Sequence, residues 1–296
     1  MDNKDFKILV PTDFSEQSNL ALHQAIHFAN IIKAQVTLLY VLQEKKGILG
    51  SIFNKPQEKT FDNAIIEKLK EQSQTYNNKH KLKIDYQLEH STSIHGSILE
   101  YSNKNNFDII IIGKGSIFEN GEEIPSIGSN AAKIVRHSKI PVITIGNSGH
   151  SIDIRSILLP LDLSKETRQK VNWALKIAKI SKAKINVISI LDKDSNKEST
   201  IKVQIQMKQV ITFIKKQGVD CSSSIIDSKN DNDHKAIINR YIESHPNIDL
   251  AIIMTQQEND FTEFFVGSSA TALIRSIKIP VLSVIPRELE TIIWGV

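Results

Sequence analysis

The chain has 296 residues, about twice the roughly 150 residues of a typical domain. Hydrophobic residues make up 40% and charged residues 24%, values ordinary for a soluble globular protein. The 37 Lys and Arg exceed the 33 Asp and Glu by only four, and no basic cluster alternates with aromatic residues, so a nucleic-acid partner is not expected.

Short apolar runs alternate with helical periodicity along the first half of the chain. The first run, 7–10, ends at Pro11, and Asp13 or Ser15 can cap the helix that follows to about residue 34. Beyond it the pattern predicts strands over 35–42, 83–88, 109–112 and 142–145, helices over 64–78, 97–104 and 129–137, and a polar loop over 43–60.

The second half predicts the same order of elements. The expected strands are 156–159, 185–190, 222–226, 250–253 and 281–284, and the expected helices are 165–182, 200–217, 234–244 and 268–277. Strict alternation of strand and helix favours right-handed crossovers and parallel sheets with helices on both faces.

The two halves also repeat in sequence, which indicates a tandem duplication. Residues 8–15 (ILVPTDFS) align without gaps with 157–164 (ILLPLDLS). Three later landmarks follow in the same order: 107–112 with 248–253, Gly128-Ser129 with Gly267-Ser268, and 139–142 with 278–281. We therefore expect two α/β domains, 1–148 and 153–287, followed by an apolar tail, 288–296.

The composition argues against several classes of site. The single cysteine, Cys221, excludes an internal disulfide and a cysteine-based zinc cage, and the nine scattered histidines give no metal site. The N-terminus has no apolar signal core, and runs such as 109–112 are too short to span a bilayer. A cytoplasmic protein without a membrane partner is expected.

Ligands of such parallel sheets sit beyond the carboxyl ends of the strands, where this chain places a suitable set of residues. Gly113, Gly115 and Ser116 follow one strand, and Gly128, Ser129 and Asn130 open a helix whose N–H groups suit phosphate. Asp13 can accept from a ribose hydroxyl or an adenine amino group. Pro11, Thr12 and Val41 complete the predicted adenine-nucleotide site; the alternative is that the glycines serve only turns and a cap.

Four segments carry a resemblance to a known family: ILVPTDFS, DIIIIG, and the pair GSNAAKIVRHSKIPVITI and GSSATALIRSIKIPVLSV. On these segments each half resembles the universal stress protein family over nearly its full length. The resemblance implies a Rossmann-like domain of five parallel strands. It also implies an adenine-nucleotide site marked by G-x2-G-x9-G-[S/T], holding ATP, with or without Mg²⁺. The sequence places no general base there, so no catalytic residue and no enzyme is expected, while slow hydrolysis of ATP stays open.

The same resemblance predicts how the halves associate. Single domains of the family commonly pair through their fifth strands, so 142–145 and 281–284 are expected to lie antiparallel in an internal pseudo-dimer. A homodimer of the whole chain remains open. The tail 291–296 (TIIWGV) is expected to dock on a domain surface or a second chain.

Both halves depart from the family's glycine motif. In the first half Ser116 occupies the position of the motif's second glycine, and the nearest glycine, Gly115, comes one residue too early. The loop 117–127 is two residues longer than the motif allows and carries three acids. In the second half Met254 and Gln257 replace the early glycines, so that half is expected to bind no nucleotide.

Two other functions therefore stay open. The chain could be a nucleotide-free interaction protein of the same family, binding an unknown protein through the loop 47–60 with its apolar Ile48, Leu49, Ile52 and Phe53. If the acidic loop after Gly113 fills the predicted nucleotide site, the interaction protein is favoured; if the loop folds outward, ATP binding is favoured. A hydrolase or nucleotidyl-transfer enzyme is disfavoured, because PTDFSEQ after the first strand is no phosphate loop.

Overall fold

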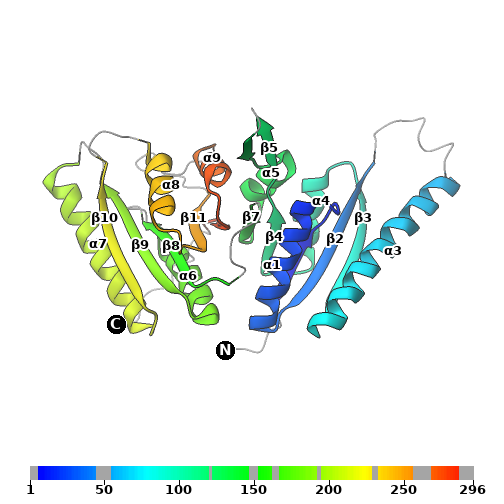
Figure 1. The fold of residues 1–296 in the computed structure, drawn as a ribbon, viewed down its shortest axis with the longest axis horizontal. Coiled ribbons are helices and arrows are strands. Elements are labelled where there is room, and N and C mark those ends of the chain that lie inside the picture. The colour runs from blue at the N-terminus through cyan, green and yellow to red at the C-terminus, as the bar shows by residue number, and fades with distance from the viewer. Residues whose placement is uncertain are drawn as a thin grey trace.

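The computed structural model describes residues 6–44, 55–119, 122–146, 153–161, 167–191, 195–228, 233–255 and 268–286. The apolar segment 48–53 of the predicted interaction loop and the tail 288–296 lie outside these ranges, as do Asp162, Gln257 and Gly267. Figure 1 shows the described elements as two α/β halves joined edge to edge.

The first half runs from β1 to β7. Its elements are β1 (Lys7–Pro11), α1 (Glu16–Ile32), β2 (Gln35–Gln43), α3 (Lys55–His80), β3 (Ile84–Ser91), α4 (Ile94–Lys104), β4 (Ile109–Gly113), β5 (Ser116–Glu119), β6 (Glu122–Pro125), α5 (Ser129–His137) and β7 (Val142–Ile145).

The second half runs from β8 to β12. Its elements are β8 (Ser156–Leu161), α6 (Thr167–Ser181), β9 (Lys184–Leu191), α7 (Lys197–Lys216), β10 (Cys221–Asp227), α8 (His234–Ser244), β11 (Leu250–Met254), α9 (Ser268–Ser276) and β12 (Val281–Val284).

One sheet passes through both halves, in the order β10-β9-β8-β11-β12-β7-β4-β1-β2-β3. Pairing is parallel within each half and antiparallel between β7 and β12, where Ile143 faces Leu282. The predicted antiparallel junction is thus confirmed. Pairing the two strands removes two edges that would otherwise present unpaired backbone groups.

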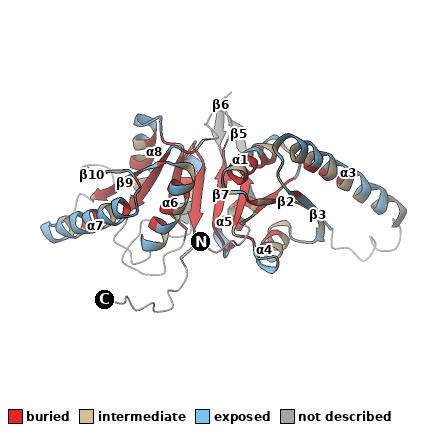
Figure 2. Cartoon of the chain, turned by 90° about the horizontal axis from the view of Figure 1, so that it is seen from below, coloured by how far each residue is buried: buried red, intermediate tan, exposed pale blue. Residues whose placement is uncertain are grey.

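The central strands are buried on both faces, which explains why they read as continuous apolar runs (Figure 2). In β1, Ile8 and Val10 belong to one hydrophobic cluster, whereas Leu9 belongs to the cluster on the opposite face. Helices α1, α3, α6 and α7 supply residues to the first cluster, and α4, α5, α8 and α9 to the second.

The duplication is visible in backbone detail. Asp108 accepts a hydrogen bond from the N–H of Lys7 at 2.9 Å, and Asp249 accepts from the N–H groups of Arg155 and Ser156 at 2.8 and 3.0 Å. In both halves the aspartate before the fourth strand therefore fixes the start of the first strand, which explains the repeated FDII and IDLA segments.

Several predicted boundaries were wrong. α3 begins at Lys55 instead of 64, within the predicted loop, and Pro56 lies in its first turn, where a missing N–H costs nothing. α4 begins at Ile94 because Ser93 caps it by accepting from the N–H of Gly96, and α7 begins at Lys197 because Asn196 accepts from Ser199. None of the described helices combines the length and apolar character needed to cross a bilayer.

Candidate functional site

A cleft of about 670 Å³ opens where β1, β2 and β4 end and α5 begins, within the usual size range of ligand sites. We call it the first-half cleft. Nine of the ten residues predicted for the nucleotide site line it: Pro11, Thr12, Asp13, Val41, Gly113, Gly115, Gly128, Ser129 and Asn130. The tenth, Ser116, begins β5.

The turn between β1 and α1 forms one rim of the cleft. Phe14 has a φ of 63°, and the Thr12 hydroxyl stabilises this left-handed turn by accepting from the Phe14 N–H at 3.1 Å. Ser15 is the N-cap of α1, accepting from the N–H of Ser18 at 3.2 Å. The first turn of α1 is therefore already capped by its own side chains and is a poor place for phosphate.

Asp13 lies on the same rim with an exposed side chain. Desolvation acts to raise its pKa, but hydrogen bonds from the backbone and hydroxyl of Ser15 and from Ser18 outweigh it, so the net pKa lies below its ordinary value. Its Oδ1 accepts from the Ser15 N–H at 3.0 Å. Asp13 is thus an ionised acceptor at neutral pH, suited to hydroxyl or amino groups of a ligand.

Helix α5 begins on the other rim. Its N-cap is Gly128, which offers no side-chain hydrogen bond, so the first-turn N–H groups have no capping side chain. The helix dipole adds positive potential at the same end. This N-terminus is accordingly the better anion-binding group of the two that border the cleft.

The stretch between Gly115 and Gly128 was expected to be a loop and is a β-hairpin. Strands β5 and β6 pair antiparallel from Ser116 opposite Pro125 to Glu119 opposite Glu122, and the N–H of Ser126 donates to the carbonyl of Gly115 at 2.9 Å. Figure 1 shows β5 projecting from the body of the first half. The hairpin absorbs the extra length of the loop.

The three cleft glycines are present for different reasons. A Cβ on Gly113 would lie 2.4 Å from the carbonyl oxygen of Gln17, so this glycine lets β4 pack against the backbone of α1. We had expected it to admit a ligand. A Cβ on Gly115 or Gly128 would meet no atom within 4 Å, and Gly128 has an ordinary φ of −60°. The space beside these two glycines is open for a ligand.

The cleft also has an apolar wall that our sequence reasoning missed. It is formed by Leu39, Tyr40, Leu42, Ile94, Ile98, Ile112 and Ile134, with Gln17, Ser18 and Gln43 among its remaining neighbours. Part of this wall could have been found from the sequence. In a parallel sheet of this topology, the end of the second strand and the N-terminus of α4 lie beside the end of the first strand. A flat ring would find apolar contacts there.

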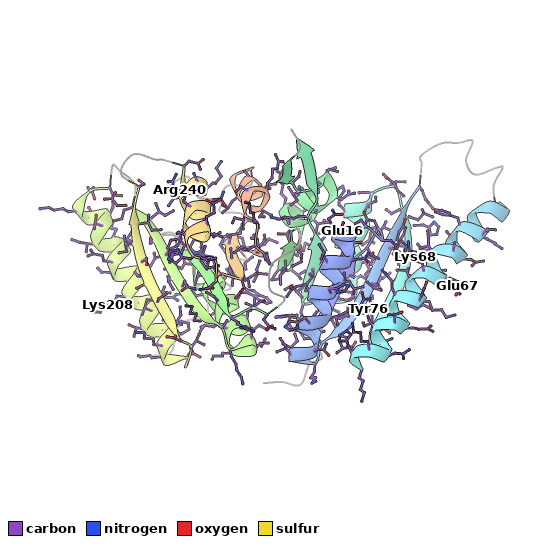
Figure 3. The ribbon with its side chains drawn as sticks, in the orientation of Figure 1. Glu16, Glu67, Lys68, Tyr76, Lys208 and Arg240 are labelled. Carbon is purple, nitrogen blue, oxygen red and sulfur yellow. The ribbon has the colours of Figure 1, made fainter. Side chains whose placement is uncertain are left out.

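An aromatic pair supports this wall from behind. Phe14 stacks on Tyr40 with ring centroids 5.1 Å apart, and the ammonium group of Lys68 lies 4.3 Å from the Phe14 ring centroid. Lys68 projects from α3, and nearby Tyr76 contacts His23 of α1 at 2.7 Å (Figure 3). These contacts connect α3 both to α1 and to the turn before α1 that forms the rim.

The first-half cleft is poor in charge. Among the described residues that line it, Asp13 is the single acid and there is no Lys or Arg. No group of three or more His, Cys, Asp or Glu in the described part of the chain could hold a metal ion. A phosphate here would rely on backbone N–H groups, on hydroxyls such as that of Ser129, and on a cation brought with the ligand.

Lys114, between two cleft glycines, points away from the cleft and into the other half. Its side chain is only 1% exposed, and its Nζ donates to the carbonyl oxygens of Ile274, at 2.9 Å, and Ile277 at the C-terminal end of α9. Burial lowers its pKa to about 8. Sequence reasoning gave Lys114 no role, since its partners lie about 160 residues further along the chain.

The equivalent position in the second half is Thr255. The N–H of Lys114 donates to Ile145, and the N–H of Thr255 donates to Val284, so the two residues occupy matching sites after the fourth strands. Met254, the residue predicted to block nucleotide binding, is completely buried in β11. Asp162 and Gly267 of that half lie outside the described residues.

Comparison with known proteins agrees with the repeated design. The model of the universal stress protein family matches twice, over residues 6–146 and 153–284. Universal stress protein MJ0577 of Methanocaldococcus jannaschii is 29% identical over 154 residues, which cover 47% of this chain and 93% of that protein.

Solved structures match both halves together. A universal stress protein from Archaeoglobus fulgidus superposes with a TM-score of 0.70 at 16% identity, covering 95% of this chain and 97% of that one. A functionally unknown protein from Pseudomonas aeruginosa gives a TM-score of 0.64 at 18% identity, covering 96% and 93%. At these identities the likeness concerns the fold.

Proposed function

Because this chain belongs to the universal stress protein family, we propose that it is a stress-response regulator that binds ATP or another adenine nucleotide in the first-half cleft. The observation that carries the proposal is the open space beside Gly115 and Gly128, where an added Cβ would meet no atom within 4 Å. The uncapped N-terminus of α5 borders that same space.

The proposed pose follows from the chemistry of the walls. Phosphates sit at the first turn of α5 and near the Ser129 hydroxyl, the adenine ring lies on the apolar wall, and Asp13 accepts from a hydroxyl or amino group. With no Lys or Arg among the described lining residues, Mg²⁺ carried by the phosphates would offset their charge. We assign no catalytic residue, since the described lining holds one acid, Asp13, and no His, Cys, Lys or Arg to act beside it.

Replacing Asp13 with alanine is expected to weaken ATP binding by about tenfold, the effect of losing one hydrogen bond to a charged group. Isothermal titration calorimetry with ATP and Mg²⁺ on the full chain measures it. Glu16→Gln is the matched control: Glu16 is an exposed acid three residues away that does not line the cleft, so its loss should leave affinity unchanged. Absence of any heat with the wild-type chain would remove the proposal.

The runner-up function is a nucleotide-free interaction protein of the same family. It is favoured by the lack of a cation in the described lining and by the packing role of Gly113, which accounts for one motif glycine without a ligand. Mass spectrometry of the purified chain under native conditions separates the two, because a bound nucleotide adds its own mass to the intact protein.

A further inference from the structure

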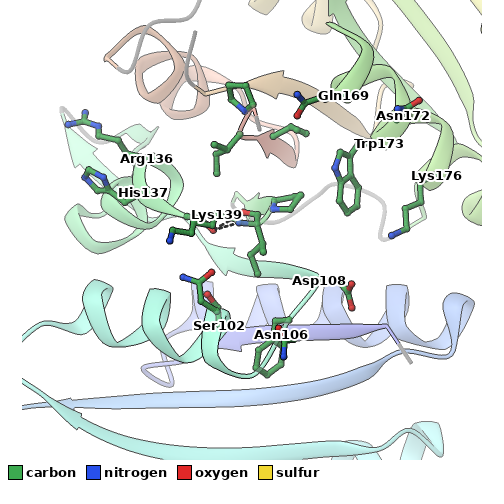
Figure 4. A pocket seen from close by; sticks show the side chains of 18 residues that line it. Ser102, Asn106, Asp108, Arg136, His137, Lys139, Gln169, Asn172, Trp173 and Lys176 are labelled. Atoms are coloured by element: carbon green, nitrogen blue, oxygen red, sulfur yellow. Dashed lines mark hydrogen bonds between the residues drawn. The ribbon is translucent and has the colours of Figure 1, made fainter. Parts of the chain in front are cut away.

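A second and larger cavity, of about 950 Å³, lies between the two halves (Figure 4). We call it the junction cleft. One wall comes from the first half, at the end of α5 and the start of β4, and the other comes from α6 and the end of β12. The polar and charged residues that line it are Ser102, Asn103, Asn106, Asp108, Arg136, His137, Ser138, Lys139, Gln169, Asn172 and Lys176.

The junction cleft is positively charged, in contrast to the first-half cleft. Among the described residues that line it, Arg136, Lys139 and Lys176 are basic and Asp108 is the one carboxylate, so this part of the lining carries a net charge of +2 without His137. Asp108 already accepts the N–H of Lys7 at the start of the sheet. Figure 4 shows Lys139 on one wall and Lys176 with Trp173 on the other, while Arg136 and His137 lie at the outer margin of the first wall and extend away from Lys176.

Lys176 is held in place by aromatic rings. Its Nζ lies 4.4 Å from the ring centroid of Phe6 and 4.7 Å from that of Trp173, and both contacts are close enough for cation–π attraction. Burial lowers its pKa, and the nearby Asp108 charge opposes that change. The indole of Trp173 is half-buried and lines the same cavity, so a positive charge and an aromatic surface are presented together.

This arrangement occurs on one side of the junction only. By the sequence offset of 149, Gln24 and His27 occupy the positions on α1 that correspond to Trp173 and Lys176 on α6. Gln24 is buried, and His27 contacts Asp153 at 2.9 Å. The cation and the indole are therefore particular to this half and are not required by the shared fold.

From these features we propose that the junction cleft binds a small organic anion that carries a planar ring, with its phosphate or carboxylate group between the cations and its ring against Trp173. The volume suits a ligand of nucleotide size. Because such a ligand would contact walls from both halves, it would bind only while the two halves are paired. The inference is independent of the function proposed for the first-half cleft.

Trp173 can report binding directly. The chain has two tryptophans, so Trp294→Phe leaves Trp173 as the only one. Titrating that variant with AMP, phthalate and inorganic phosphate should quench Trp173 with one or both of the ring-bearing anions and far less with inorganic phosphate. AMP alone would identify a phosphate ligand and phthalate alone a carboxylate. No response to either ring-bearing anion, or equal affinity for inorganic phosphate, overturns the proposal.

Matched substitutions locate the binding. Arg136→Gln and Lys176→Gln are each expected to weaken it by roughly five- to tenfold, the effect of removing one charged partner. Lys133→Gln and Lys179→Gln remove the same charge three residues away on the same helices, outside the cleft, and should have no effect. Gly128→Val fills the open space of the first-half cleft and should leave anion binding at the junction cleft unchanged. If Gly128→Val alone abolished binding, the anion would be bound in the first-half cleft and the proposal would be wrong.

Discussion

Replacing Lys114 with alanine is expected to lower the free energy of unfolding by about 3 kcal/mol, because the change removes three buried methylene groups at about 0.8 kcal/mol each and leaves a cavity. It also removes both hydrogen bonds to the end of α9. Equilibrium denaturation in urea measures the change.

Lys114→Met separates these contributions. Methionine restores most of the apolar volume of the lysine side chain but has no hydrogen-bond donor. Because it also removes the cost of burying an ammonium group, it should lower the free energy of unfolding by about half as much as alanine does, or less. An alanine variant as stable as the wild type would mean that the contact with Ile274 and Ile277 contributes nothing to holding the halves together.

The same lysine should make stability depend on pH. Burial lowers its pKa to about 8, while the unfolded chain keeps the ordinary value of 10.5. Between these values the unfolded state binds more protons than the native state, so the free energy of unfolding rises with pH. The neutral amine still has two N–H groups for its two carbonyl partners.

Relative to Lys114→Met, which has no titratable group at this position, the wild type should gain about 2 kcal/mol between pH 7 and about pH 9.5. Denaturation of both proteins at the two pH values gives the difference, and other titrating groups cancel in the comparison. A difference that stays constant or falls would show that Lys114 keeps its proton throughout this range.

Gly113→Ala is expected to lower the free energy of unfolding by about 3 kcal/mol. The added methyl group would overpack against a backbone atom and force α1 away from β4. The new Cβ would lie 2.4 Å from the Gln17 carbonyl oxygen and 2.5 Å from its carbon. Because Gln17 and Ser18 also line the cleft, ligand affinity should fall together with stability.

Gly115→Ala is the matched control, with the same added methyl group two residues along the chain. Nothing lies within 4 Å of that Cβ, and Gly115 has no left-handed φ, so stability should stay within about 0.5 kcal/mol of the wild type. Thermal unfolding of both variants compares them directly; equal loss in both would mean that the close approach of α1 is not what requires glycine at 113.

The fold was largely predictable because its signals are local or repeated. The apolar runs of β1 and β4 and the duplicated ILVPTD-type segment predicted the strands and the division into halves, and the resemblance to the family predicted the β7–β12 junction. Helix starts were harder to place, since Ser93 and Asn196 act as caps in stretches without strong apolar periodicity.

The candidate site was predictable only where its residues follow strands directly. Asp13, Gly128 and Ser129 were found because the ends of parallel strands gather at one edge of a sheet. The hairpin escaped notice because four-residue strands are too short to show a clear alternation, and acids flank their few apolar residues. Nothing local connects Lys114 with α9 or Trp173 with Arg136, since those pairs are brought together by the association of the halves.

Lys114, which has no lysine counterpart at the matching position of the second half, illustrates what fusion of two copies permits. In an assembly of identical subunits any substitution appears at both symmetric positions, so a lysine after the fourth strand would place two buried ammonium groups near the same axis. Here the second position holds Thr255, so of these two matching positions one carries a buried ammonium group and the other does not. Covalent linkage also keeps the ratio of the halves at one to one and makes their pairing independent of protein concentration.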